Sequence, residues 1–202
     1  MVERRAASLK QQRSIETREA LLSGAARVFS DLSYSGTRLR TIANESGISE
    51  GAMYFHFGTK AELANAVLAE QQERMTEVLA SMQEEEGDAL EKLVLLMNRL
   101  AVLISTDRIV QGGIRLAADP NVEITADARD PYFEWIAIAQ SLIEEGVRDG
   151  SIRADVVPAA AAEYANALFV GAQVLSGLED GWVSFPSRID RLTPFLRREL
   201  GD

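Results

Sequence analysis

The sequence predicts an all-α protein with about nine helices. Apolar residues recur at spacings of three and four along most of the 202 residues, which is the repeat of an amphipathic helix. Candidate N-caps and capping boxes stand before several of these stretches. Short apolar runs such as Trp182 and Val183 lack the alternation that a β-strand shows. We therefore expect helices joined by turns and no sheet.

The first three predicted helices are short and lie near the N-terminus. Residues 15–32 carry apolar side chains on one helical face. Thr37 is placed to cap a second helix, and Ser49 is placed to cap a third. Between them, Gly47 can adopt the positive φ of a tight turn without steric cost. Three helices with such a turn form a helix-turn-helix unit.

The remaining predicted helices are mostly longer. Thr59 and Glu62 have the spacing of a capping box and start a helix that reaches about residue 83. Asp88 and Glu91 start the next helix in the same way. Proline is favoured at the first helical position, so we expect one helix to begin at Pro131 and another at about Pro158. The remaining predicted helices are a short one at 108–117, one from Pro131 to about residue 149, one at 158–176 and one at 187–199.

Composition excludes several classes of protein. The apolar content of 47% and the charged content of 26% are ordinary for a globular protein. Cysteine is absent, which excludes disulfides, thiolate metal sites and thiol nucleophiles. The first residues are polar and basic, unlike a signal peptide, and no apolar run reaches the roughly 18 residues of a membrane span. We expect a soluble, cytoplasmic protein.

The net charge of −10 is divided unevenly along the chain. Residues 1–60 hold nine basic and six acidic side chains, a net +3, whereas residues 61–202 hold 12 basic and 25 acidic ones, a net −13. A local basic surface can bind phosphates even when the rest of the protein is acidic. Charge therefore permits a nucleic-acid interface in the first 60 residues, and a merely solvated surface is the alternative.

Residues 37–60 carry the most specific motif. After the glycine turn, residues 49–60 read Ser-x-Gly-x-x-Tyr-x-His-Phe-x-x-Lys. This pattern closely resembles the DNA-binding signature of TetR-family repressors, and the resemblance extends over residues 14–70. It implies a helix-turn-helix DNA-binding domain at residues 1–60. It also implies an effector-binding and dimerisation domain at residues 61–202.

The chemistry of the motif suits a helix that enters the major groove of DNA. Gly51 has no side chain to hold the DNA away, and small residues let a helix fit the groove. Glu50 departs from the Lys or Arg often found there; it could accept a hydrogen bond from cytosine N4 or merely be solvated. Met53 and Phe57 are expected in the core, and Phe55 is left open between packing and contact. The predicted DNA-binding residues are Thr37, Arg38, Ser49, Gly51, Ala52, Tyr54, His56 and Lys60.

The resemblance also implies an effector pocket and a homodimer through the last two long helices. The alanine-rich stretch at 158–176 allows another helix to approach closely, although packing within one chain would explain it too. Residues 111–117 and 131–135 resemble receptors for γ-butyrolactone signalling molecules, which place a tryptophan over the ligand, as Trp135 would be. The predicted ligand-binding residues are Met97, Leu100, Ile104, Ile114, Phe133, Trp135, Phe169, Val170, Gln173 and Val174.

No pattern of an enzyme, a cofactor or a metal site is present. The single histidine, His56, belongs to the motif, and no glycine-rich loop follows a strand. A site made of carboxylates alone is left open. The sequence therefore predicts a ligand-responsive repressor that binds a palindromic operator as a dimer. The alternatives are an architectural DNA-binding protein without effector and a helical enzyme fused to a DNA-binding module.

Overall fold

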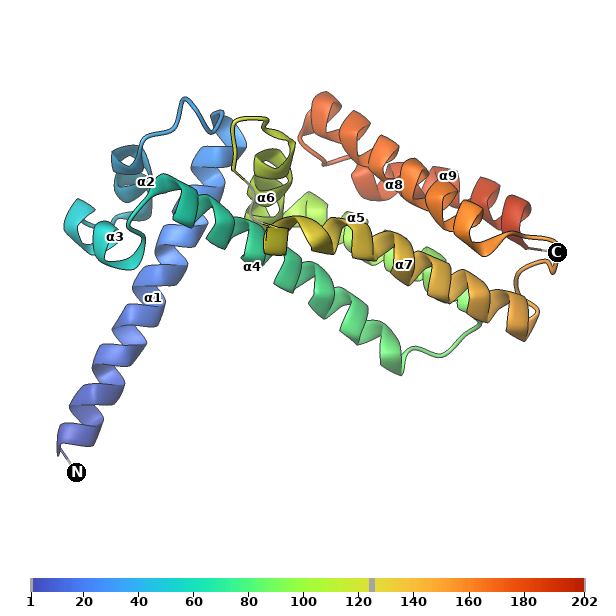
Figure 1. Cartoon of the computed structure of the whole chain (residues 1–202), viewed down its shortest axis with the longest axis horizontal. Helices are drawn as coiled ribbons and strands as arrows, with labels where there is room; N and C mark the ends of the chain where they lie inside the picture. Colours follow the sequence, from blue (N-terminus) through green and yellow to red (C-terminus); the bar gives the residue numbers. More distant parts are fainter. Residues whose placement is uncertain (1, 124–125, 202) are drawn as a thin grey trace. The chain divides into compact units, whose positions relative to one another are not determined.

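The computed structural model describes residues 2–123 and 126–201, and the side chains of residues 9, 11–123 and 134–201 (Figure 1). Over these ranges it contains nine α-helices, one short 3-10 helix and no strand, so the all-α prediction is confirmed. The chain forms two compact units. The predicted domain boundary at residue 60 stays a prediction.

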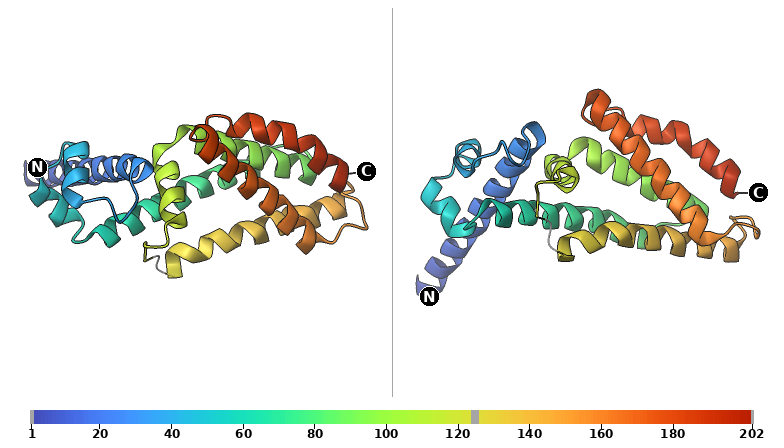
Figure 2. Two further views of the ribbon diagram at one scale, coloured as in Figure 1. Left: turned by 90° about the horizontal axis from the view of Figure 1, so that it is seen from above. Right: turned by 45° about the horizontal axis from the view of Figure 1, so that its top comes forward.

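The first unit comprises Met1–Gln72 and Arg108–Ala128. In it α6 crosses α1 and packs against it, as Figure 2 shows, and α2 packs on α1 and α3. Its helices are α1 (Val2–Asp31), α2 (Leu39–Ser46), α3 (Glu50–His56), the first part of α4 (Lys60–Ser81) and α6 (Arg108–Ala118). Each contributes to one apolar core, which includes Leu21, Ile42, Met53, Leu63 and Leu116.

The helix-turn-helix corner has the predicted turn and cap. Gly47 has φ of +67°, and its N–H donates to the carbonyls that end α2. The Ser49 hydroxyl accepts a hydrogen bond from the Ala52 N–H at 3.2 Å, which caps α3. The predicted cap at Thr37 is wrong, because α2 begins at Leu39 with Arg38 in the capping position. The Thr37 hydroxyl turns back instead and donates to the Ser33 carbonyl at 2.9 Å.

Two adjacent glycines allow α6 to approach α1 and α4 closely. A Cβ on Gly112 would lie 2.8 Å from the Ala26 carbonyl oxygen, and one on Gly113 would lie 2.5 Å from Oε1 of Gln71. Both distances are shorter than real Cβ contacts. Helix α6 can therefore occupy this position only with side-chain-free residues at these two points.

The second unit comprises Glu73–Asp107 and Arg129–Asp202. In it α9 packs on α5 and on α8 (Figure 2). Its apolar cluster contains buried Met75, Met82, Leu96 and Leu100, against which Trp135 and Phe169 pack. Besides the end of α4, its elements are η1 (Met82–Glu84), α5 (Ala89–Thr106), α7 (Ala126–Asp149), α8 (Pro158–Asp180) and α9 (Phe185–Leu200).

Helix starts outside the corner agree with the sequence in most cases. The Asp88 carboxylate caps α5 by accepting from the Glu91 N–H at 2.8 Å, and Pro158 opens α8. The prediction that Pro131 opens a helix is wrong, because α7 begins at Ala126. The intervening alanines favour a helix, and acidic residues favour its first turn. No described helix is both long and apolar enough to cross a membrane.

Candidate nucleic-acid interface

Helix α3 is fixed by one fully buried side chain and presents several others outward. Met53 is fully buried in the core, whereas Tyr54 and Phe55 are 54% and 83% exposed. A Cβ added to Gly51 would meet nothing within 4 Å, so packing within the chain does not require glycine there. A glycine that the fold does not need, on an exposed helix, is consistent with close approach by an external partner.

The other predicted residues of α3 lie on the same short helix. Ser49 uses its hydroxyl oxygen as the cap. Ala52 is half-buried, as is His56, whose ring meets the edge of Phe55 at 5.4 Å between centroids. The structure thus brings Ser49, Gly51, Ala52, Tyr54 and His56 together on one turn-and-helix segment.

Lys60 and Thr37 are placed differently, since both belong to an internal network. The Lys60 ammonium donates to the carbonyls of Tyr34 at 2.8 Å and of Thr37 at 3.1 Å, and it lies 4.2 Å from the centre of the Tyr34 ring. Thr37 is buried, and Arg38 beside it is exposed. A phosphate would therefore meet Arg38 directly, whereas Lys60 would have to exchange one of its present partners.

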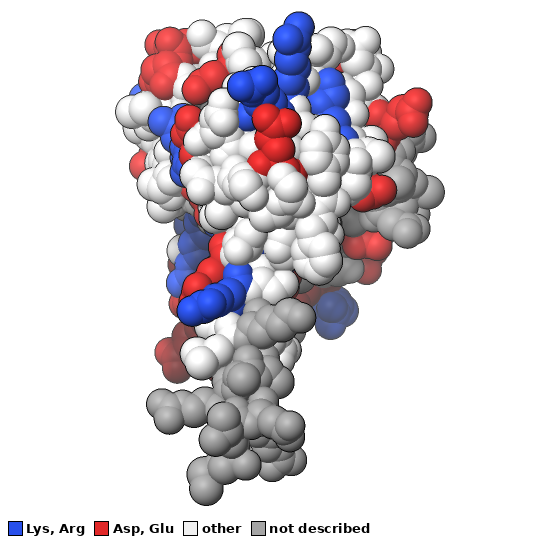
Figure 3. All heavy atoms as spheres, turned by 90° about the vertical axis from the view of Figure 1, so that its left-hand side faces the viewer, with Lys and Arg blue, Asp and Glu red and all other residues white. Residues whose placement is uncertain are grey.

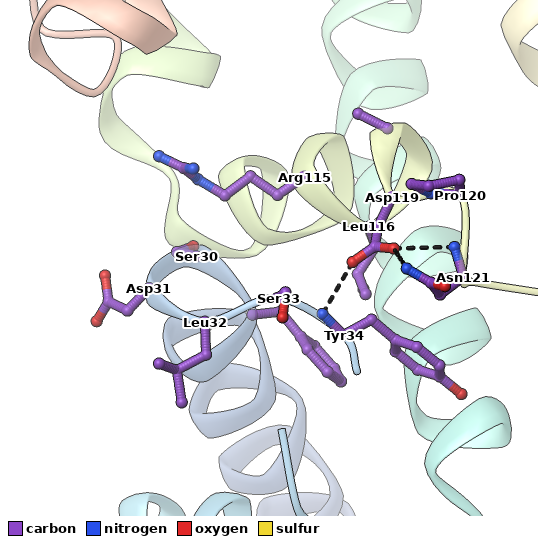
Figure 4. A pocket seen from close by; sticks show the side chains of 12 residues that line it. Ser30, Asp31, Leu32, Ser33, Tyr34, Arg115, Leu116, Asp119, Pro120 and Asn121 are labelled. Carbon is purple, nitrogen blue, oxygen red and sulfur yellow. Dashed lines mark hydrogen bonds between the residues drawn. The ribbon is translucent and has the colours of Figure 1, made fainter. Parts of the chain in front are cut away.

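The same network reaches the end of α6 through Asp119 (Figure 4). The Tyr34 N–H donates to the Asp119 carboxylate at 3.0 Å, and the Asn121 N–H donates to it at 2.9 Å. The hydrogen bonds from Asn121, with smaller contributions from Tyr34 and the Lys60 charge, lower the pKa of Asp119. Burial, with the nearby Glu123 and Asp119 carboxylates, raises the pKa of Tyr34.

A groove of about 510 Å³ lies beside this network, between the end of α1 and the end of α6 (Figure 4). Its lining includes Phe29, Leu32, Arg115 and Asn121. Both walls belong to the first unit, so the groove marks where the end of α6 meets the end of α1.

Charges on this end of the molecule are mixed rather than uniformly basic. Figure 3 shows Lys and Arg side chains next to Asp and Glu side chains on the same face. Arg40 Nε lies 3.4 Å from a Glu50 carboxylate oxygen, and Arg27 Nε lies 2.8 Å from a Glu45 carboxylate oxygen. Neither Arg40 nor Phe55 was among the predicted DNA contacts, although both are strongly exposed next to them.

The predicted ligand-binding residues differ in burial and belong to both units, and their role stays a prediction. Met97, Leu100 and Ile104 are buried on α5, and Trp135 and Phe169 pack against the cluster that contains Leu100. Val170 and Val174 are exposed on α8, Gln173 on the same helix is half-buried, and Ile114 belongs to the first unit. Phe133 lies outside the described side chains. Among the residues searched, no group of carboxylates and histidine could hold a metal ion.

Comparison with known proteins identifies the family. The profile described as "Bacterial regulatory proteins, tetR family" matches residues 21–67, and "Tetracyclin repressor-like, C-terminal domain" matches residues 87–201. The chain belongs to the TetR family. Because this is a family of regulatory proteins, the prediction that this TetR-family chain is not an enzyme is confirmed.

Individual relatives of this TetR-family chain include receptors. The A-factor receptor protein of Streptomyces griseus is 27% identical over 172 residues, which cover 85% of the chain but only 59% of that protein. A solved γ-butyrolactone receptor (ArpA-like protein) superposes with a TM-score of 0.73 at 28% identity, covering 93% of the chain and 99% of the receptor. The predicted likeness to this sub-family is confirmed.

A relative solved with its operator sequence is also similar in fold. The TetR-family protein CprB from Streptomyces coelicolor, in complex with its biological operator sequence, superposes with a TM-score of 0.82 at 26% identity. The match covers 94% of this chain and 90% of CprB. Likeness of this extent includes the helix-turn-helix region described above.

Proposed function

We propose that this protein is a ligand-responsive transcriptional repressor in the cytoplasm. It binds a palindromic operator as a homodimer and is released by a small apolar effector of the γ-butyrolactone class. The observation that carries the proposal is the helix-turn-helix corner, in which α3 is anchored by Met53 and presents Gly51, Tyr54 and Phe55 outward. An α-helix of this kind fits the major groove of DNA.

The dimer would form through α8 and α9. Both helices expose large apolar side chains in a single chain, namely Val170, Val174, Leu175, Leu178 and Phe195. Between them lies a groove of about 350 Å³ whose lining includes the small residues Ala167 and Gly171. Exposed apolar surface of this extent on two adjacent helices is typical of an interface. A two-fold dimer would place its two α3 helices about 34 Å apart, or a multiple of that, which requires a palindromic operator.

The effector would bind in the second unit, next to Trp135. The indole ring offers a large apolar face to a lactone ring, and it already packs with Phe169 on the methionine-rich cluster of α4 and α5. Methionine side chains adapt to cavities of irregular shape, which suits a cluster that must open for a ligand. The likeness to γ-butyrolactone receptors supports this class of effector.

The release of DNA would follow from a difference between the effector's affinities for two conformations of the protein, one of which binds DNA more tightly. A ligand shifts a two-state equilibrium only by the ratio of its affinities for the two states, and typical coupling is about 1–3 kcal/mol. Helix α4 begins next to the DNA-binding corner at Lys60 and continues to Ser81, beyond Met75 of the apolar cluster. Ligand binding in the second unit could therefore reach the helix-turn-helix corner through a change in the tilt of α4.

The test is selection of DNA by the purified protein from a pool of random duplexes, followed by addition of synthetic γ-butyrolactones. We expect enrichment of a palindrome, two chains per duplex, and release by at least one lactone. Failure to enrich any sequence would overturn the proposal. Binding that is indifferent to every small molecule would favour an architectural protein instead.

A further inference from the structure

An ion pair joins the two helices of the DNA-binding corner on their exposed surface. Arg40 lies on α2, and Glu50 is the first residue of α3. Nε of Arg40 is 3.4 Å from Oε1 of Glu50, and the two side chains are 77% and 51% exposed. Within the part of the chain that the structure describes, neither side chain has another ion-pair partner. The pair is therefore a local feature of the surface that would face DNA.

This ion pair is not needed to hold the fold together. The two helices are already fixed by fully buried Ile42 and Met53 and by the turn at Gly47. Exposed ion pairs contribute little to stability, because water screens the attraction and both side chains lose freedom. Since its contribution to stability is small, we consider the effect of this ion pair on the binding of DNA to the surface.

The charge of this surface bears directly on DNA binding. Binding that ignores sequence depends on the number of phosphate charges that Lys and Arg neutralise. Glu50 cancels the charge of Arg40 at the point where a free arginine would strengthen such binding. Specificity is a difference between two affinities, and it rises when binding to the wrong partner is weakened.

We propose that Glu50 is a specificity-determining residue, which holds Arg40 in an ion pair and so suppresses binding to DNA of unselected sequence. The inference rests on the proposed function, since it presumes DNA as the ligand. Glu50 acts through Arg40 and is a positioning residue. Opening of the pair leaves Arg40 free to contact a phosphate.

Another ion pair of this unit provides a matched control. Glu45 accepts from Arg27 at 2.8 Å, and the Arg27 guanidinium also donates to the Glu45 carbonyl at 3.3 Å. This pair ties α1 to the end of α2, where a Cβ on Gly24 would collide with Ser46. Glu45→Gln changes the net charge by the same amount as Glu50→Gln but leaves Arg40 paired.

The test measures binding to a labelled duplex of random sequence by fluorescence anisotropy over a series of salt concentrations. The variants are Glu50→Gln, Arg40→Gln, the double variant and Glu45→Gln. We expect Glu50→Gln to raise the affinity severalfold and to steepen the salt slope by about 0.9, the value of one added phosphate contact. Arg40→Gln in the Glu50→Gln background should abolish this gain, and Glu45→Gln should produce a smaller one.

Two results would overturn the inference while leaving the proposed function intact. One is wild-type affinity and slope for Glu50→Gln with helical content unchanged by circular dichroism. The other is an equal gain from Glu50→Gln when Arg40 has been replaced, since Glu50 would then repel DNA directly. If the wild-type protein binds neither random duplexes nor any selected sequence, the proposed function itself fails.

Discussion

The Lys60 ammonium donates a hydrogen bond to the Tyr34 carbonyl oxygen at 2.8 Å. This bond fastens the start of α4 to the loop between α1 and α2. Because the Tyr34 N–H also donates to Asp119, the same loop is fastened to the end of α6. This loop, which joins α1 to α2, is thus also fastened to α4 and to the end of α6, and any movement of α6 relative to α4 must break or strain one of these bonds.

Lys60→Ala should destabilise the protein by about 1–3 kcal/mol, the range for losing hydrogen bonds to a charged donor. If Lys60 also contacts a phosphate, as the motif predicts, the salt slope of DNA binding should fall by about 0.9. Thermal unfolding and salt-dependent anisotropy measure the two effects separately. Lys92→Ala on α5 is the control, which removes the same charge outside the network. An unchanged slope would exclude Lys60 from the DNA contacts, and unchanged stability would contradict the role of the network.

Gly51→Ala should stabilise the free protein slightly while weakening DNA binding. Alanine is favoured over glycine in a helix by about 1 kcal/mol, and its Cβ would meet nothing within 4 Å. The loss of affinity would come from the DNA, which the added methyl group keeps at a distance. Gly47→Ala should have the opposite effect on stability. Gly47 has φ of +67°, a conformation that strains alanine, so this substitution should lower the stability of the free protein. DNA binding by Gly51→Ala that equals wild type would contradict close approach at this position.

The difference between these two glycines shows what the sequence can and cannot predict. Gly47 follows a helix and precedes a cap, so its turn conformation is a local property that the sequence specifies. The cap at Ser49 and the core position of Met53 are also local, and all three predictions are confirmed. Helix periods and caps depend on neighbours within four residues, which explains why the all-α fold was predictable.

Contacts between distant residues were not predictable in this way. Nothing local to Lys60 indicates that its ammonium would meet carbonyls of Tyr34 and Thr37, which lie over twenty residues earlier in the chain. The ion pair of Arg40 with Glu50 likewise depends on the angle between two helices. The residues of a ligand site are hard to predict for the same reason. A helical period identifies the inner face of a helix but not the residues or ligand that cover this face.

Leu175→Glu on α8 should convert the dimer to a monomer and weaken operator binding. Leu175 is 55% exposed in the single chain, so a carboxylate there is compatible with the folded monomer but not with a buried apolar interface. Val102→Glu on α5 is the matched control, since Val102 is 50% exposed. Sedimentation velocity at micromolar concentration distinguishes the two. Dissociation by both variants, or by Val102→Glu alone, would contradict an interface on α8 and α9.

Asp149 should make the second unit sensitive to acid. Its carboxylate accepts from the Ala89 N–H at 3.0 Å and from the Ser151 N–H at 2.8 Å, joining the start of α5 to the end of α7. Hydrogen bonds from Ser151 and Ala89 lower the pKa of Asp149 below its ordinary 3.8. A lowered carboxyl pKa contributes stability that is present above pH 3.8 and is lost as the pH falls through the folded-state value.

Asp149→Asn should therefore cost less than about 1 kcal/mol at neutral pH, because the neutral amide accepts these hydrogen bonds less strongly but solvent screens the charge at this exposed position. The cost should shrink as the pH falls below 3.8 and through the lower folded-state pKa, where the wild-type carboxyl itself becomes protonated in the folded protein. Asp190→Asn, at an exposed position on α9, is the control. A cost for Asp149→Asn that stays constant with pH would exclude the carboxylate charge as its source.

Trp135 should report the binding of an effector and be required for the response. The chain has two tryptophans, and the other, Trp182, is buried against Gly177, where a Cβ would lie 2.9 Å from the indole ring. Trp182→Phe therefore provides a background in which Trp135 is the only fluorophore of its kind. In this background we expect a γ-butyrolactone to change the emission over the same concentration range in which it releases operator DNA.

Trp135→Leu tests whether the indole transmits the signal or merely fills space. Leucine keeps an apolar side chain in the cluster of Met75, Leu100 and Phe169, so that folding and operator binding should be close to normal. The lactone would lose the aromatic face it rests on, and aromatic contacts are worth about 0.5–1.5 kcal/mol beyond their area. The concentration for half-release should rise by about two- to thirteenfold, the same energy expressed as a ratio. Release at the wild-type concentration would remove Trp135 from the effector site, and a simultaneous loss of operator binding would show that its role is structural.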